Sequence, residues 1–376
     1  MPSYSGVWTL QAQMQAVAAG TWTGQPQLFA WGYNGNGNLG LGDTANRSSP
    51  VQVGTLPNWS QIAVGNTFTL ATKTNGTLWS WGANYYGRLG LNDTIMRSSP
   101  VQIGALTTWY QIAAGGGHSI SIKTDGTLWS WGYNNKGQLG IGNIISRSSP
   151  VQVGSLTTWY QIAGGDAFTL ATKTDGTLWS WGRNSYGQLG LGDVVYRSSP
   201  VQVGLLTTWS AISAGNNNAV AIKTDGSLWA WGNGGSGRLG VSNYANRSSP
   251  VQIGALTTWY KITAGGSHIV SVKTDGTLWG WGQNTSGQLG LNDATNRDSP
   301  VQIGALTTWY QLAGGSYFTL ATKTDGTLWS WGGNNAGRLG LGDIANRSSP
   351  VQVGALTSWS QLPKMSLSGF SFALKT

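Results

Sequence analysis

Histidine is the side chain that most often moves protons near neutral pH, and the chain has two, His118 and His268. They occupy equivalent positions in copies of one repeated segment that are three copies apart, so we expect them to be too distant to share a metal ion or a proton relay. Cysteine and glutamate are absent, and no Ser-His-Asp set, carboxylate pair or phosphate-binding loop can be assembled. We therefore predict that the protein is not an enzyme, with no catalytic residue, no metal site and no cofactor, and that each histidine caps a strand.

Aspartate recurs in glycine-rich stretches such as LGLGD, with an arginine four residues later. At this spacing a carboxylate and a guanidinium can form a charge-assisted hydrogen bond that fixes the loop. One carboxylate among glycines is a poor ligand set for Ca²⁺, which requires many oxygen ligands. We expect such loop-fixing contacts in the pairs Asp43 and Arg47, Asp193 and Arg197, and Asp343 and Arg347.

Two stretches, residues 35–40 and 235–240, match the G-x-G-x-x-G pattern of dinucleotide-binding folds. Such a site requires a helix that opens at the glycines and an acidic residue about 20 positions later, and neither stretch has them. Both align with the ordinary KGQLG turn of neighbouring copies. We interpret these glycines as turn residues.

All these positions belong to a sequence that repeats every 50 residues. LWSWG occurs at residues 78–82, 128–132, 178–182 and 328–332, and related stretches begin at residues 28, 228 and 278. No residue is inserted or deleted between Trp31 and Trp331. A fixed period of this length is typical of solenoids, propellers and other repeat folds.

One copy predicts four β-strands. The segment WYQIAAGGGHSISIKTDGTLWSWG, residues 109–132, divides into three strand-like runs separated by breaks that contain glycine. Its Asp125-Gly126 pair predicts a type I′ hairpin, in which both central residues have positive φ. Pro150 can open a fourth strand, because proline is tolerated at the first or edge position of a sheet. Four antiparallel strands in a segment of this length are typical of a β-propeller blade.

Alternation along LWSWG predicts how the blades pack. Trp79 and Trp81 should point to one side of their strand and Ser80 to the other, since successive side chains face opposite sides. The tryptophans of one blade can then pack on small residues of the next, and each buried indole removes roughly 150–250 Å² from water. The IAAG run suits the strand nearest the axis, where only small residues let the backbones converge.

The pattern GYNNKGQLGIG…RSSPVQVG…WYQIAAGGGHSISIKTDGTLWSWG resembles the RCC1-like repeat, the regulator-of-chromosome-condensation type of propeller, over residues 25–376. The resemblance implies an all-β, seven-bladed β-propeller whose ring closes inside a blade. The sequence agrees, because the last copy stops at GFSFALKT without a tryptophan strand, and QLFAWG supplies that strand from the other end. We predict that residues 359–376 and 27–53 each give two strands of the closing blade. Nucleotide-exchange members of the family carry a projecting wedge, and its absence from this ungapped repeat argues against exchange activity.

Residues 1–24 lie outside the repeat and form a predicted N-terminal segment, separate from the propeller of residues 25–376. Apolar side chains recur in it at helical spacing, and a helix this short must dock on a surface or serve as an anchor. The segment also resembles an N-terminal signature of structural proteins from marine tailed phages, which implies a component of a virion. The candidate anchor residues are Trp8, Leu10, Met14, Val17 and Trp22.

The formal net charge is +9, and most of the excess lies at repeated positions, with arginine at 47 and lysine at 73 and their equivalents every 50 residues. We interpret these cations as framework and expect no specific nucleic-acid site. No basic residue precedes Arg47, so no Sec-type signal peptide is expected. No apolar run approaches the roughly 18 residues that span a bilayer, and we expect a soluble chain.

Comparison of the copies separates the nearly constant strands from loops that vary, and loops on a rigid scaffold commonly carry binding. Apolar residues before the arginine in three consecutive copies form a candidate docking patch, here called the loop patch. The loop patch consists of Ile95, Met96, Ile144, Ile145, Val194, Val195 and Tyr196. Candidate binding residues in the stretch after the tryptophan strand are Tyr85, Tyr86, Lys136, Arg183 and Tyr186.

Two functional hypotheses follow. The first is a non-enzymatic structural protein of a virion, attached to a phage capsid or tail, with other virion proteins as partners and a host-surface glycan or protein as a further one. The second is a soluble, cytoplasmic RCC1-like interaction module that binds a GTPase, chromatin or an enzyme. The sequence predicts no oligomeric state.

Overall fold

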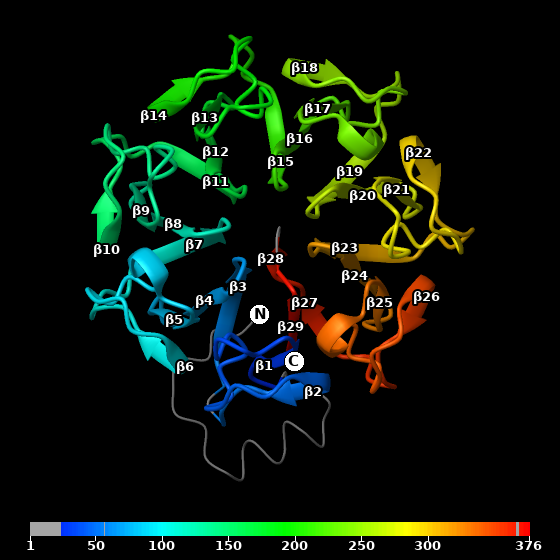
Figure 1. Ribbon diagram of the computed structural model, residues 1–376, viewed down its shortest axis with the longest axis horizontal. Coiled ribbons are helices and arrows are strands. Elements are labelled where there is room, and N and C mark those ends of the chain that lie inside the picture. Colours follow the sequence, from blue (N-terminus) through cyan, green and yellow to red (C-terminus); the bar gives the residue numbers. More distant parts are fainter. Residues whose placement is uncertain (1–23, 56, 366–367) are drawn as a thin grey trace, which may run out of the picture.

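The chain forms a ring of seven blades (Figure 1), and residues near the ring axis line a central channel. Six blades are four-stranded sheets, and one has a fifth strand. The computed structural model describes residues 24–55, 57–365 and 368–376. The predicted all-β propeller is thus confirmed. The N-terminal segment predicted over residues 1–24 lies outside the described residues except for Gly24.

Within each blade the strands are antiparallel and run in chain order from the axis outwards, except in the closing blade. The inner strands are β3 (Trp59–Val64), β7 (Trp109–Ala114), β11 (Trp159–Gly164), β15 (Trp209–Ala214), β19 (Trp259–Ala264), β23 (Trp309–Gly314) and β27 (Trp359–Gln361). The second strands are β4 (Phe68–Lys73), β8 (His118–Lys123), β12 (Phe168–Lys173), β16 (Asn218–Lys223), β20 (His268–Lys273), β24 (Phe318–Lys323) and β29 (Phe370–Lys375).

The third strands carry the paired tryptophans or their equivalents, and the outer strands carry the RSSPVQ motif or its RDSPVQ variant. The third strands are β1 (Gln27–Gly32), β5 (Leu78–Gly82), β9 (Leu128–Gly132), β13 (Leu178–Gly182), β17 (Leu228–Gly232), β21 (Leu278–Gly282) and β25 (Leu328–Gly332). The outer strands are β2 (Arg47–Gln52), β6 (Arg97–Gln102), β10 (Arg147–Gln152), β14 (Arg197–Gln202), β18 (Arg247–Gln252), β22 (Arg297–Gln302) and β26 (Arg347–Gln352). Short 3₁₀ helices follow three third strands: η1 (Tyr85–Gly87), η2 (Gly235–Gly237) and η3 (Asn335–Gly337).

The closing blade joins the two ends of the chain, as predicted. Its strand order is β2-β1-β29-β27, and β1 pairs with β29 from Gln27 opposite Lys375 to Gly32 opposite Phe370. One further strand was not predicted: β28 (Lys364–Met365) leaves this blade and pairs in parallel with β3, where Lys364 lies opposite Ala63. Pro363 precedes this departure and cannot donate a backbone hydrogen bond to a ladder.

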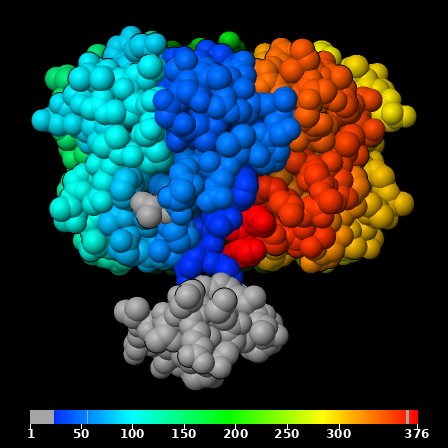
Figure 2. Space-filling view, turned by 90° about the horizontal axis from the view of Figure 1, so that it is seen from below, coloured from blue at the N-terminus to red at the C-terminus, as the bar shows by residue number. Residues whose placement is uncertain are grey.

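The ring has two different faces. The loops between third and outer strands, such as residues 133–146, lie on the same face as the links between inner and second strands; we call it the loop face. The hairpins between second and third strands, such as residues 124–127, lie on the opposite, hairpin face. Gly24 and Thr376 lie next to each other on the hairpin face, and Figure 2 shows the first described residues beside the last ones at one edge of the ring.

The hairpins differ from the type I′ prediction, which was wrong. Gly126 has φ +77° but Asp125 is not among the described residues with positive φ. The Gly126 N–H donates to the Lys123 carbonyl at 3.0 Å, which closes a type I turn followed by a left-handed glycine. The physical reason is the Asp125 carboxylate, whose Oδ1 accepts from the Thr127 N–H at 3.0 Å and from its Oγ1 at 2.6 Å.

The two tryptophans of each LWSWG strand have different roles. Trp81 is fully buried, its Nε1 donates to the Asn38 carbonyl of the preceding blade at 2.9 Å, and it packs on Gly40 of that blade. This confirms the predicted packing between blades for Trp81. Trp79 is only partly buried and packs instead on Trp59 of its own blade, with ring centroids 6.1 Å apart, under the Lys73 ammonium.

Candidate functional site: the loop face

The loop patch is exposed on the loop face. Ile95 and Ile144 are each 64% exposed, and the other five members of the patch are exposed as well. Two further exposed apolar side chains, Tyr244 and Ile344, occupy the equivalent loops of other blades and were missed by sequence comparison. The sequence could have identified both, because each stands at the position equivalent to Ile144 in its own copy.

Consecutive loops contact one another across blade boundaries. The Asn92 N–H donates to the Ser148 carbonyl of the next blade at 2.8 Å, and Ser149 Oγ donates to Asn92 Oδ1 at 3.2 Å. Gly87 packs directly on the Ser148 backbone, which leaves no room for a side chain at residue 87. Each loop is thus held by the outer strand of its neighbour, just after the apolar residues of the next loop.

Aromatic and basic side chains continue this surface. The rings of Tyr86 and Tyr133 stack with centroids 4.2 Å apart, and Lys136 Nζ lies 5.5 Å from the Tyr196 ring of the next blade. The Tyr196 hydroxyl is 2.7 Å from Ser185 Oγ. This hydrogen bond is the main cause of a lowered Tyr196 pKa, to which the positive charge of Lys136 adds. The structure therefore brings Lys136 of the variable loops to the loop patch.

Arg183 lies on the same face as Asp166, with Nη1 3.8 Å from Oδ2. Burial raises the Asp166 pKa, and the Arg183 charge offsets part of that rise. The Arg183 guanidinium also lies 5.9 Å from the Tyr186 ring centroid, so these two candidate residues are neighbours. Tyr85 has a different role, because Arg88 Nε donates to its carbonyl at 3.0 Å and the Arg88 guanidinium lies over its ring.

The charge of this surface is positive. Residues 83–97, 133–147 and 183–197 together contain six arginine and lysine residues and two aspartates. Both aspartates are paired: Asp93 with Arg97 at 2.6 Å and Asp193 with Arg197 at 2.5 Å. The predicted contacts of Asp43 with Arg47 and of Asp343 with Arg347 are confirmed, each at 2.5 Å. An acidic group on a partner would be attracted to this face.

Each histidine is buried and contacts the neighbouring blade. His118 Nε2 lies 2.9 Å from Thr169 Oγ1, and His268 Nε2 lies 3.0 Å from Thr319 Oγ1. The two do not meet, as predicted. Across the part of the chain that the structure describes, no three His, Cys, Asp or Glu side chains gather as a possible metal site.

A second set of exposed apolar residues lies on the hairpin face and was not selected from the sequence. It repeats from copy to copy, in the motif LTTWY, and the repetition concealed it from a search for variable positions. Gln61 Nε2 donates to the Tyr110 carbonyl of the next blade at 2.6 Å, which indicates a framework role for this region. The tyrosines of the set are Tyr110, Tyr160, Tyr260 and Tyr310, and the leucines of the motif and of its LTTWS and LTSWS variants are Leu106, Leu156, Leu206, Leu256, Leu306 and Leu356. Leu205, which precedes the motif in one copy, is exposed as well.

A family model described as the RCC1-like domain matches residues 7–270 and, in a second alignment, residues 110–375. The chain belongs to the RCC1-like domain family. The two matches overlap because a regular repeat fits the model in more than one register. The family that the repeat motif indicated is thereby confirmed.

Three solved structures share the architecture of this RCC1-like propeller, each with a TM-score of 0.84 over 94% of the chain. A chain in the structure of Kap60 bound to yeast RCC1 (Prp20) is 22% identical and is covered to 89%. Prp20p from Saccharomyces cerevisiae is 23% identical and covered to 92%. Human WBSCR16 is 21% identical and covered to 99%. At these identities the similarity establishes the fold.

The candidate anchor residues Trp8, Leu10, Met14, Val17 and Trp22 lie outside the described residues. None of the comparisons supports the virion hypothesis that these residues suggested; they favour the alternative of an RCC1-like module. Within the described ranges no helix has the length and apolar character required to cross a bilayer.

Proposed function

We propose that this RCC1-like propeller is a non-enzymatic protein-protein interaction module whose partner docks on the loop patch. The observation that carries the proposal is the set of exposed apolar side chains in the loops of three consecutive blades, where the loop of one blade is hydrogen-bonded to the outer strand of the next. Exposed apolar clusters rimmed by polar groups are typical of protein-binding surfaces. A ring closed by β1 and β29 provides a rigid base for these loops.

The charge of the loop face favours an acidic partner. The solved structure of Prp20p is described together with its binding properties to Gsp1p and histones, and another structure has Kap60 bound to yeast RCC1. Histones are basic, and a chain with a net charge of +9 would repel them. Among partner classes, an acidic or neutral protein surface with apolar side chains therefore fits this propeller best.

We further propose the division into an N-terminal segment of residues 1–24 and a propeller of residues 25–376. The described chain leaves the ring at Gly24 on the hairpin face, opposite the loop patch. An attachment through the N-terminal segment would leave the loop patch free. This holds for the interaction module and equally for the virion hypothesis.

Photocrosslinking tests the proposal. A benzophenone amino acid replaces Ile145 in one version of the full-length chain and Leu306, on the hairpin face, in a matched version, and both are expressed in the source cells. We expect a discrete crosslinked protein from residue 145 that residue 306 does not give. The triple variant Ile95→Ser, Ile145→Ser, Val195→Ser should then weaken binding of the purified partner at least about tenfold, which corresponds to about 1.4 kcal/mol.

Equal crosslinking from both positions, or unchanged affinity of the triple variant, would contradict the proposal. Density-gradient sedimentation of the same lysate separates the two hypotheses. Co-migration of the chain with capsid-sized particles, and crosslinks to capsid or tail proteins, would support the virion hypothesis instead.

A further inference from the structure

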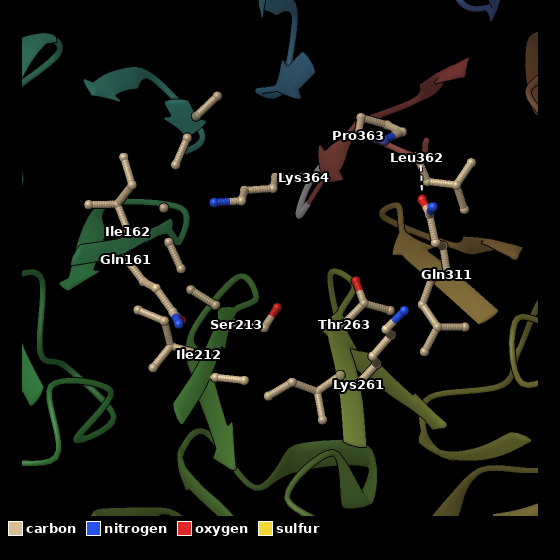
Figure 3. A pocket seen from close by; sticks show the side chains of 18 of the residues that line it. Gln161, Ile162, Ile212, Ser213, Lys261, Thr263, Gln311, Leu362, Pro363 and Lys364 are labelled. Carbon is tan, nitrogen blue, oxygen red and sulfur yellow. Dashed lines mark hydrogen bonds between the residues drawn. The ribbon is translucent and has the colours of Figure 1, made fainter. Parts of the chain in front are cut away.

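The central channel contains a cavity of about 410 Å³, lined by strands β7, β11, β15, β19 and β23 and by residues 362–364 (Figure 3). Lys364 enters it from β28, and Lys261 extends from β19 towards β23. The Leu362 N–H donates to Gln311 Oε1 at 2.9 Å, which fixes the segment that carries Lys364. The cavity is large enough for a small organic anion.

Both lysines depart from the repeat. Position 261 is glutamine in five of the other copies, at 61, 111, 161, 311 and 361. Where glutamine is present, as at Gln161, its Nε2 donates to a backbone carbonyl of the next blade, here Ser210 at 2.8 Å. Lys261 instead places its Nζ 3.7 Å from the Tyr310 ring centroid. By the 50-residue spacing Lys364 stands where the other copies have Val64, Ala114, Gly164, Ala214, Ala264 and Gly314, but the chain has left its blade here and pairs with β3. The other blades pack without a lysine at either position, so the ring itself does not require these two lysines.

Two hydroxyl groups also appear where other copies have alanine. Ser213 and Thr263 line the same cavity on neighbouring inner strands. Ser213 Oγ accepts from the Ala264 N–H at 2.9 Å, and Thr263 Oγ1 accepts from the Gly314 N–H at 3.0 Å. A hydroxyl that accepts a hydrogen bond can still donate its own proton, so both side chains can donate to a bound group. The departures from the repeat therefore add hydrogen-bond donors.

The chain supplies no negative charge to balance the two ammonium groups. No aspartate is among the described residues that line the cavity, and neither lysine forms an ion pair within residues 24–55, 57–365 and 368–376. The remaining residues, 1–23, 56 and 366–367, include no acidic side chain. Lys364 Nζ has a neutral neighbour, Gln111 Oε1, at 3.5 Å. Water in the channel reaches Lys364, but the surrounding strands limit its hydration and lower its pKa to about 8; they lower the pKa of Lys261 as well.

We propose that the central channel is a binding site for a small oxyanion, carrying phosphate or carboxylate groups, that Ser213 and Thr263 hydrogen-bond. Lys364 and Lys261 turn towards this anion from their present contacts with Gln111 and Tyr310 on opposite sides of the cavity (Figure 3). An anion here forms charge-assisted hydrogen bonds in a site that otherwise contains uncompensated charge. This site is separate from the loop patch and does not depend on the proposed interaction with a protein partner.

Calorimetric titration of the full-length chain with inorganic pyrophosphate and with citrate, at pH 7 and constant ionic strength set with NaCl, tests this site. Lys261→Gln introduces the residue that five other copies carry. Lys364→Ala shortens a side chain that forms no ion pair with a described residue, so the fold should tolerate both changes. We expect one bound anion per chain, and each variant should weaken its binding at least about tenfold. Lys136→Gln, which removes the same charge on the loop face, should bind as the unchanged chain does.

Binding of pyrophosphate alone would assign a phosphate ligand, and binding of citrate alone a carboxylate ligand. Three results would overturn the proposal: no saturable binding of either anion, equal affinity in the Lys364→Ala and Lys261→Gln variants, or an equal loss in Lys136→Gln. Circular dichroism and the Tm of each variant establish that the compared chains are folded.

Discussion

His118 donates a hydrogen bond from Nε2 to Thr169 Oγ1 of the next blade at 2.9 Å. The direction follows from the threonine, whose hydroxyl donates to the Gln138 carbonyl at 2.9 Å and so can only accept from the histidine. His118 Nδ1 is then the unprotonated nitrogen, and it has no hydrogen-bond partner among the described residues. Burial, reinforced by the nearby Arg88 charge, lowers the His118 pKa to about 3.

The first prediction concerns acid stability. His118 stays neutral in the folded chain down to about pH 3 but takes up a proton in the unfolded chain below its ordinary pKa of 6.5, so stability is present above pH 6.5 and is lost as pH falls towards 3. His118→Phe introduces the residue of the equivalent positions 68, 168 and 318. The variant should lose about 2 kcal/mol less stability than the unchanged chain between pH 7 and 4.5, by urea unfolding. His268→Phe should act alike, and an unchanged pH dependence in both would refute the assignment.

The second prediction concerns the contact between blades. A Cβ on Gly40 would lie 2.8 Å from Trp81 Nε1, whereas one on Gly54 would meet nothing within 4 Å, although both glycines have positive φ. Gly54→Ala should cost about 1 kcal/mol, the backbone penalty alone. Gly40→Ala should cost a further 1–3 kcal/mol, roughly, because the buried indole has to move. Thermal unfolding of the two variants measures the loss of stability in each. Equal losses would show that the Trp81 side chain can move away from residue 40 without a cost in stability.

The third prediction concerns Lys364. Its folded pKa of about 8 lies below the ordinary 10.5, so the charged group opposes folding below pH 8 and the opposition fades as pH rises from 8 to 10.5. Lys261 and Tyr260 are the other titratable groups lining this cavity. In buffer without multivalent anions, Lys364→Ala should be more stable at pH 7 by about 1 kcal/mol, allowing for the water that reaches the side chain. That advantage should vanish by about pH 10.5; a constant difference in Tm across this range would disprove it.

The fourth prediction concerns the loop aspartates. Asp93 accepts from the Ile95 N–H at 2.9 Å and pairs with Arg97 at 2.6 Å. Two copies already have asparagine here, and Asn143 Oδ1 makes the same backbone contact with Ile145 at 3.0 Å. Asp93→Asn should therefore cost less than about 1 kcal/mol at pH 7, the range of a partly exposed ion pair. Asp93→Ala, which removes the backbone contact too, should cost more, and equal Tm values for the two variants would contradict this account.

Repetition explains which features could be predicted from the sequence. The blades, the closing strands and the Asp-Arg contacts occur in several copies, so local pattern and period identify them together. The turn at Asp125 was mispredicted because Asp-Gly occurs in two hairpin types, and the capping of Thr127 by the carboxylate decides between them. β28 and the cavity around Lys364 depend on where the single irregular segment after Pro363 runs. Such placement is set by tertiary contacts, and no local pattern encodes it.

The pairing of β1 with β29 also governs the order in which the molecule can be completed. During synthesis β1 and β2 emerge first, and their partner strand is made last, so the first hairpin waits with one unpaired edge while six blades assemble from local contacts. Contacts between distant parts of a chain form slowly, and an open strand edge can pair with other chains in the meantime. Newly made protein is therefore most exposed to aggregation until residues 370–375 leave the ribosome, and a circular permutant with both ends in one hairpin should close faster and aggregate less.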